Sequence, residues 1–126
     1  IGIAPHTLQI SVNDQHLKEL YNRALLFVYP SYYEGFGIPI LEAYTCNCPV
    51  ALSQASCFPE IAENAAAYFD PFSVSSMAEA IKSVIYDEAE RTRLILAGKE
   101  RIKLYSWEKA TRQTELVYRK VAKAVF

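Results

Sequence analysis

Two glutamates flank a glycine-containing stretch near the middle of the chain, in the run Glu34-Gly35-Phe36-Gly37-Ile38-Pro39-Ile40-Leu41-Glu42. Carboxylates can accept hydrogen bonds from neighbouring hydroxyl groups, such as those of a ribose or a sugar ring. The two glycines permit unusual backbone angles and let a ligand approach the main chain closely. The run therefore favours a site for a hydroxyl-rich ligand, although a glutamate near a helix start and a Gly-x-Gly loop are also common without one.

A helix predicted to begin at Ile38 would add an anion-binding group to the same run. The first-turn N–H groups of a helix are unpaired and carry a partial positive charge, a combination that suits a phosphate or another anionic oxygen. Pro39 fits the first turn because its missing N–H is not needed there. The run lacks the Gly-Lys-Ser/Thr of a Walker loop and the full Gly-x-Gly-x-x-Gly fingerprint, so neither of those phosphate sites is predicted.

The elements that must position this run alternate between short apolar segments and segments of helical period. Strands are predicted at 7–12, 25–29, 49–52 and 65–69, and helices at 14–24, 38–45, 58–61, 74–85, 88–104 and 107–125. This alternation predicts βαβ units and a parallel sheet with right-handed crossovers. Ligands of such sheets bind beyond the carboxyl ends of the strands, and Glu34 follows the strand that ends at Tyr29.

Local signals fix several of these boundaries. Asn13, Ser73 and Ser106 can each cap the helix that follows, and Asn47 suits a left-handed position after the helix at 38–45. Gly98, inside a predicted helix, indicates close packing against a neighbour, because glycine there costs about 1 kcal/mol relative to alanine. The last helix is predicted to have one buried face, formed by Trp107, Ala110, Thr114, Val117, Val121 and Val125.

The composition is that of an ordinary globular domain. The 126 residues are 52% apolar and 21% charged, with no run long enough to span a membrane. Residues 1–74 carry two Lys/Arg against seven Asp/Glu, and residues 75–126 carry eleven against seven. The basic second half favours the solvated faces of amphipathic helices and leaves an anionic partner open. A start without Met and only four strands predict a single partial domain over 1–126.

The three cysteines are Cys46, Cys48 and Cys57. An odd count without extracellular features favours reduced thiols and a cytoplasmic location. A zinc site would need four ligands at tetrahedral spacing, and the two histidines, His6 and His16, lie far upstream. We therefore expect small buried side chains here and no metal ligand.

Further segments extend the pattern around Glu34 to Glu42. An apolar strand and Pro30-Ser31 precede it, Ala43 follows, and Pro49-Val50-Ala51, Pro59-Glu60-Ile61, Tyr68-Phe69-Asp70-Pro71 and Ser106-Trp107 come later in order. This arrangement resembles the C-terminal domain of the group 1 type retaining glycosyltransferases, which share the two-domain GT-B architecture. The resemblance implies an α/β, Rossmann-like parallel sheet with flanking helices and a helical C-terminal end. It also implies that the N-terminal acceptor domain and the start of this domain are absent.

The resemblance implies a role for each matched residue. Glu34 would be the catalytic residue, lying against the transferred sugar and stabilising charge rather than attacking. The amides around Gly35, Phe36, Gly37 and Ile38 would contact the sugar hydroxyls and the diphosphate, and Glu42 would bind the ribose hydroxyls. Such enzymes use a nucleotide-sugar as substrate, with no metal and no cofactor. They transfer the sugar with retention, by front-side attack in which the leaving phosphate assists deprotonation of the acceptor.

Two departures from the family pattern concern the same site. Asn47-Cys48 stands where relatives have Gly-Thr, and Asn tolerates the left-handed conformation that the turn requires. Relatives also have an Arg and a Lys upstream that clamp the diphosphate. Only Lys18 and Arg23 precede the run in this chain, and we interpret both as surface residues. Neither of them is assigned to the diphosphate.

The parent protein is accordingly predicted to be a glycosyltransferase of polysaccharide biosynthesis that acts on a glycan, a lipid-linked acceptor or a small molecule. The isolated chain is expected to be inactive. No nucleic acid is expected as a partner, and the basic second half leaves peripheral contact with the cytoplasmic membrane face open. The sequence leaves two alternatives open: a non-catalytic Rossmann-like module that binds a partner, and a nucleotide-sugar epimerase of the same fold.

Overall fold

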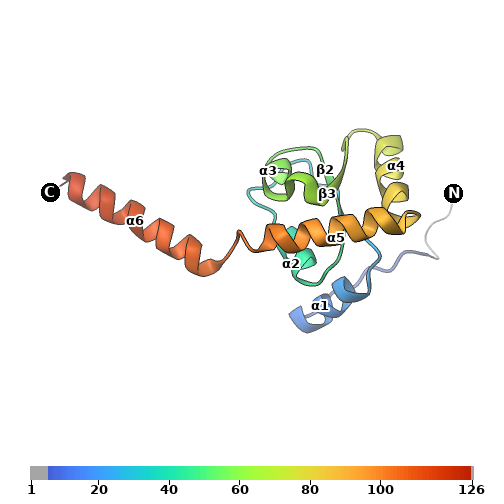
Figure 1. Cartoon of the computed structure of the whole chain (residues 1–126), viewed down its shortest axis with the longest axis horizontal. Coiled ribbons are helices and arrows are strands. Elements are labelled where there is room, and N and C mark those ends of the chain that lie inside the picture. The colour runs from blue at the N-terminus through green and yellow to red at the C-terminus, as the bar shows by residue number, and fades with distance from the viewer. Residues whose placement is uncertain (1–5, 126) are drawn as a thin grey trace.

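The computed structural model describes residues 6–125, which form a parallel sheet flanked by helices (Figure 1). The sheet contains β1 (Phe27–Tyr29), β2 (Val50–Ser53) and β3 (Ala66–Phe69) in the order β1-β2-β3, and both pairs of neighbours are parallel. Every residue of the central strand β2 is buried, as expected for a strand covered on both faces. The predicted α/β class and the parallel sheet are confirmed.

Six α-helices and a short 3-10 helix surround or extend this sheet in the described chain. Figure 1 shows α5 running across the body and α6 projecting away from it. Their bounds are α1 Asp14–Arg23, α2 Ile38–Thr45, α3 Phe58–Ala62, η2 Glu63–Ala65, α4 Val74–Ile85, α5 Glu88–Ile102 and α6 Trp107–Val125. None of these helices is both long enough and apolar enough to cross a bilayer.

Side-chain caps begin the helices where the sequence predicted them. The carboxamide of Asn13 accepts from the backbone N–H of His16 at 2.9 Å, and the hydroxyls of Ser73 and Ser106 accept from amides three residues on, at 3.2 and 3.1 Å. Each bond satisfies a donor that has no partner within the helix. Asn47 adopts a φ of 57° just after α2, so the predicted left-handed turn forms without glycine.

The predicted strand at 7–12 is wrong. These residues form no strand, and Leu8 is 81% exposed. A strand needs a neighbour to bond its main-chain groups, and among the described residues β1 pairs only with β2. The same lack of a second neighbour leaves β1 half-buried, where the apolar run at 25–29 predicted burial on both faces.

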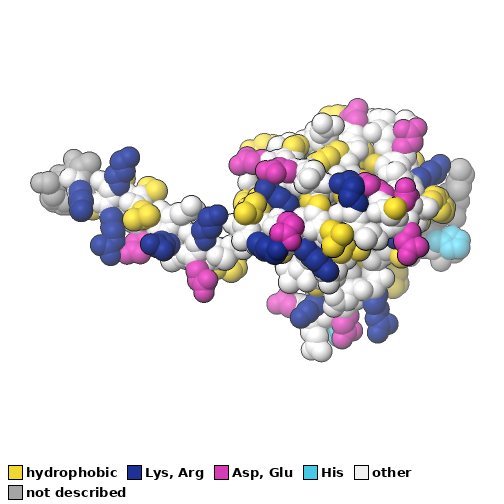
Figure 2. Space-filling model, in the orientation of Figure 1, with side chains coloured by type: hydrophobic (Ala, Val, Ile, Leu, Met, Phe, Trp, Pro, Cys, Tyr) yellow, Lys and Arg dark blue, Asp and Glu magenta, His cyan; other side chains and the backbone are white. Residues whose placement is uncertain are grey.

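The predicted buried face of the last helix is also wrong. Helix α6 extends away from the body, and each of its residues from 107 to 123 is exposed, including Trp107 at 80% (Figures 1 and 2). The side chain of Val125, the last member of the predicted stripe, lies outside the described part. A spacing of three and four residues specifies an apolar face but not the surface that covers it. Lys and Arg side chains also stand along this helix in Figure 2, in agreement with solvated helix surfaces.

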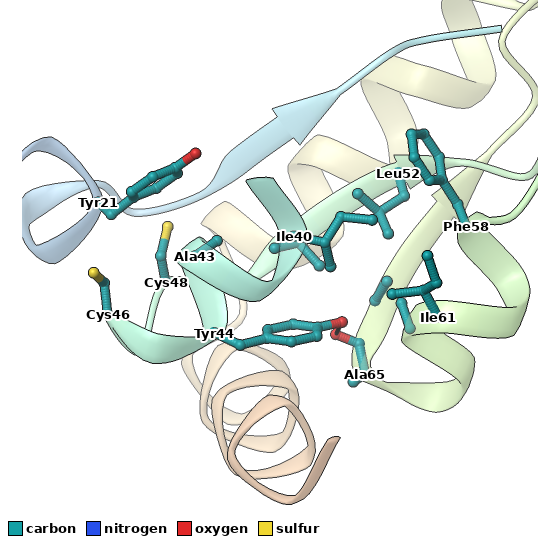
Figure 3. Close-up of a cluster of buried hydrophobic side chains, with 13 residues drawn as sticks. Tyr21, Ile40, Ala43, Tyr44, Cys46, Cys48, Leu52, Phe58, Ile61 and Ala65 are labelled. Atoms are coloured by element: carbon teal, nitrogen blue, oxygen red, sulfur yellow. Dashed lines mark hydrogen bonds between the residues drawn. The ribbon is translucent and has the colours of Figure 1, made fainter. Parts of the chain in front are cut away.

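The core lies between α2, the sheet and α3 (Figure 3). Tyr44 reaches from α2 toward Ala65, whose carbonyl accepts the phenol proton at 3.1 Å. Cys46 and Cys48 are buried in the same cluster, as predicted, whereas Cys57, which was also expected to be buried, is half-buried in the loop before α3. Burial raises the pKa of the Cys48 thiol to about 11, which opposes the thiolate form that binds metals.

Gly98 allows α5 to lie directly against Tyr44. A Cβ atom added at Gly98 would stand 2.5 Å from Cδ1 of that ring, so the predicted close packing is confirmed. We expect Gly98→Ala to destabilise the protein by about 1–3 kcal/mol, the usual cost of overfilling a core. Chemical denaturation measures this as a lower midpoint. Gly35→Ala is the matched control, because a Cβ there meets nothing within 4 Å, and an equal loss in both variants would contradict the packing argument.

Candidate functional site

The candidate residues lie at the carboxyl edge of the sheet. The register pairs Tyr29 with Leu52 and Ser53 with Phe69, so the three strands end close together. The segment 30–37 leaves β1 at this edge, and the segment 54–57 leaves β2 beside it. This is the edge at which open parallel sheets bind ligands, and Glu34 and Gly37 lie beyond it as the sequence predicted.

Gly37 forms the corner where the loop becomes α2. Its φ is 96°, a conformation that side chains rarely adopt, and a Cβ there would stand 3.0 Å from the ring of Phe58. Glycine is therefore required both by the backbone angle and by the buried ring. As the N-cap, it has no side chain to accept from the first-turn amides, and the Ile38 N–H is left available to an anion.

Glu34 presents its carboxylate from the loop before this corner. Its Oε1 accepts a hydrogen bond from the hydroxyl of Ser31 at 2.7 Å. That bond, with a second from the Tyr29 hydroxyl, holds the pKa of Glu34 below its usual range, because both bonds favour the charged form. Glu34 is therefore ionised and oriented at neutral pH.

Glu42 lies one turn inside α2 and is exposed. Its Oε2 accepts a hydrogen bond from the hydroxyl of Tyr21 at 3.3 Å, and Tyr21 is itself fixed by burial and by an edge-on contact with Phe27 at 5.3 Å. Burial, followed by the charge of Glu42, raises the pKa of the Tyr21 phenol. The phenol therefore remains a donor, and α1 positions the second carboxylate.

Glu42 borders two hollows in the surface. The larger, of about 1020 Å³, lies between α2, the end of α5 and the start of α6, and the smaller, of about 250 Å³, lies between α1 and α2. Phe36 lines the larger hollow and makes an edge-on contact with Tyr105 at 5.7 Å. Lys18, which the sequence placed on the surface, is exposed and lines the smaller hollow. A ligand that contacts Glu42 thus has room on either side of it.

The structure brings all six predicted site residues to one loop–helix corner, with Glu34 through Ile38 before or at the helix start and Glu42 within it. It also adds side chains that the sequence did not indicate, namely Tyr21, Ser31, Ser56 and Cys57, each of which bonds a residue of the run. Their residue types are common, and three of the four contacts join positions more than twenty residues apart. Within residues 6–125, no group of three or more His, Cys, Asp or Glu side chains could hold a metal ion.

Comparisons with known proteins give a consistent result. Residues 4–101 match the family model described as glycosyl transferases group 1. The chain is 40% identical over 108 residues to an O-antigen chain mannosyltransferase B of Escherichia coli, covering 86% of this chain and 28% of that protein. It is 32% identical over 115 residues to an alpha-maltose-1-phosphate synthase of Mycolicibacterium smegmatis, covering 84% and 30%.

A solved structure shows the same fold. The sucrose-phosphate synthase of Thermosynechococcus elongatus superposes with a TM-score of 0.83 and 30% sequence identity, over 94% of this chain and 30% of that one. The chain therefore spans less than a third of the length of these relatives. The family model covers most of the chain, including every candidate site residue. The chain belongs to the group 1 glycosyl transferases.

Proposed function

We propose that the chain is the donor-binding portion of a retaining glycosyltransferase that transfers a sugar from a nucleotide-sugar. The observation that carries this proposal is the pair of carboxylates at Glu34 and Glu42 on either side of the uncapped start of α2. Hydroxyl-binding and phosphate-binding groups are thereby combined within nine residues, at the ligand-binding edge of the sheet. A nucleotide-sugar carries both kinds of group.

Each part of the donor has a proposed contact. The sugar lies against Glu34, and its hydroxyls and the diphosphate meet the backbone around Gly35, Phe36, Gly37 and Ile38. The ribose hydroxyls bond Glu42. No cofactor takes part, and no metal is needed, because the partial positive charge at the start of α2 and protein cations hold the leaving diphosphate.

We propose the transfer step that the resemblance to the retaining group 1 glycosyltransferases implies. The bond between the sugar's anomeric carbon and the phosphate oxygen breaks, and an acceptor hydroxyl oxygen bonds to the same face of that carbon. The acceptor proton passes to the leaving phosphate, and a nucleoside diphosphate is released. Positive charge develops on the sugar during this step, and the ionised, oriented carboxylate of Glu34 stabilises it without attacking.

We expect the acceptor to bind to a part of the parent protein that lies outside this chain. One relative is named as an O-antigen chain mannosyltransferase, which supports a glycan acceptor and a role in polysaccharide biosynthesis. The relatives reported above are named as transferases or synthases, and this favours transfer over epimerisation or a non-catalytic module. The isolated chain is expected to be inactive.

A donor panel tests the proposal. The full-length protein is titrated with UDP-, GDP- and ADP-sugars, mannose donors first, with water as the acceptor, and the nucleoside diphosphate released by this hydrolysis is measured with and without EDTA. We expect saturable release from one nucleotide-sugar, unchanged by EDTA. No release from any donor would refute the transferase, and loss of release in EDTA would refute the metal-free mechanism.

Removing the phenol that supports Glu42 should weaken donor binding. In the full-length protein we expect Tyr21→Phe to raise the donor KM about 2- to 10-fold, the equivalent of one hydrogen bond, with kcat unchanged. Initial rates over a range of donor concentrations give both constants. Tyr118→Phe on the exposed part of α6 is the control, and an unchanged KM in Tyr21→Phe would contradict positioning of Glu42 by Tyr21.

Removing the hydroxyl that supports Glu34 should change the pH dependence of transfer. Since the bond from Ser31 lowers the pKa of Glu34, its loss in Ser31→Ala raises that pKa. If transfer requires the carboxylate, activity falls as the pH drops through the pKa, so the acid limb of the kcat profile moves to higher pH. Ser83→Ala, which removes a hydroxyl bonded within α4, should leave the limb in place. An identical limb in Ser31→Ala would contradict a requirement for ionised Glu34.

A further inference from the structure

The loop after β2 holds the backbone of Glu34 through one side chain. The hydroxyl of Ser56 donates to the carbonyl oxygen of Glu34 at 2.8 Å and accepts from the N–H of the same residue at 3.3 Å. Both main-chain hydrogen-bonding groups of Glu34 are therefore satisfied by one atom from a segment 22 residues away. The thiol of Cys57 also lies 3.3 Å from the Glu34 carbonyl and 3.1 Å from that of Phe36.

Ser56 holds this position in an unfavourable backbone conformation. Its φ is 54°, in the left-handed region that glycine adopts without penalty and a residue with a Cβ does not. A loop selected only for its turn would favour glycine here. Backbone strain that persists indicates a compensating role for the side chain, and the side chain of Ser56 contacts Glu34.

The carboxylate and the backbone of Glu34 are thus fixed from two directions. Ser31 bonds the carboxylate from within the same loop, and Ser56 bonds the main chain from the neighbouring one. A catalytic group must be held within a fraction of an ångström of its working position, and a loop achieves this only with such supporting bonds. The other contacts of the loop 31–37 are made by exposed rings, Tyr32 stacking on Phe72 at 5.0 Å and Phe36 meeting Tyr105 edge-on at 5.7 Å, and neither of them holds Glu34 directly.

We infer that Ser56, supported by Cys57, is a positioning residue for Glu34, and that turnover depends on its hydroxyl rather than on the stability that it contributes. This inference rests on the proposed function for its catalytic consequence. The geometric part, that Ser56 restrains the loop 31–37, stands on the contacts alone.

Two variants of Ser56 separate the hydroxyl from the backbone strain. Both Ser56→Gly and Ser56→Ala remove the hydroxyl, but only the glycine variant relieves the left-handed strain. We expect kcat to fall about 10-fold in both, the scale of a small misplacement of a catalytic group, with the donor KM within about 3-fold of wild type. The thermal midpoint should be higher for Ser56→Gly than for Ser56→Ala.

The full-length enzyme is measured by initial rates, thermal unfolding and hydrogen exchange, with Ser83→Ala as a control. Exchange in the peptide covering residues 31–37 should be faster in both Ser56 variants, with unchanged exchange in α4. An unchanged kcat, or a kcat that falls in proportion to the thermal midpoint of each variant, would overturn the positioning role. Unchanged hydrogen exchange in residues 31–37 would overturn the restraint of the loop. A wild-type enzyme inactive with every nucleotide-sugar would overturn the proposed function and the catalytic role of Ser56, while the exchange measurement would still decide the restraint.

Discussion

Replacing Glu34 with alanine in the full-length enzyme is expected to lower kcat about 100-fold, the scale measured when one preorganised electrostatic group is removed from an active site. The donor KM should change much less, because the charge that Glu34 stabilises develops only as the bond to the diphosphate breaks. The bond from Ser31 at 2.7 Å and the lowered pKa place an ionised, oriented carboxylate at this position before the donor binds. A group prepared in this way stabilises charge without reorganising during the reaction.

Glu34→Gln separates the charge from the shape. The carboxamide keeps the length of the side chain and can still accept a bond from the Ser31 hydroxyl, but it has no charge. We expect a loss in kcat close to that of the alanine variant if charge stabilisation dominates, and a smaller loss if the side chain only holds the sugar in place. Glu79→Ala, an exposed carboxylate on α4, is the control. Normal turnover in both Glu34 variants would refute the catalytic assignment.

Local chemistry determines the elements that carry the site, which is why the sequence predicted them. The bounds of α2 follow from Gly37 and Pro39 at its start and from Asn47 just beyond its end. Buried strand β2 and the capped helices depend likewise on residues within a few positions of each boundary. Because such signals do not depend on the rest of the fold, the sequence alone is enough to predict the elements that they delimit.

The wrong predictions for residues 7–12 and for α6 both concern contacts with another part of the fold. Each pattern, the alternation at 7–12 and the apolar stripe of α6, describes only one side of a contact. Within residues 6–125, the segment 7–12 is not part of the sheet, and α6 is exposed. Periodicity records that a face is apolar but contains no information about the surface that covers it.

The supporting bonds of the site were unpredictable for a related reason. Tyr21 meets Glu42 across 21 positions and Ser56 meets Glu34 across 22, and tyrosine and serine occur at many positions without such a role. The positive φ of Ser56 is the one feature that distinguishes it, and it belongs to the folded chain. The sequence could thus identify the groups that contact a ligand but not those that orient them.

The remaining large effect concerns the nucleotide. Glu42→Ala should weaken donor binding by about 1–3 kcal/mol, the cost of losing hydrogen bonds to a charged group, and should leave kcat at saturating donor nearly unchanged. Glu42 is exposed and lies inside α2, where alanine is a better helix former than glutamate, so the helix should persist. Calorimetric titration of the full-length protein with the matching nucleoside diphosphate measures the affinity, and Glu79→Ala is again the control.

The ribose assignment is tested most directly by changing the ligand as well as the protein. Wild type should bind the 2′,3′-dideoxy form of the nucleoside diphosphate more weakly than the parent compound, because Glu42 would lose the hydroxyls that donate to it. The Glu42→Ala variant should bind the two ligands with equal affinity. The loss of binding free energy when the protein and the ligand are both changed should therefore be smaller than the sum of the losses from each change alone. Additive losses would show that Glu42 acts elsewhere on the donor, and unchanged affinity for the normal diphosphate would remove it from the site. Since Tyr21 bonds the same carboxylate, Tyr21→Phe should reduce the preference for the ribose without abolishing it.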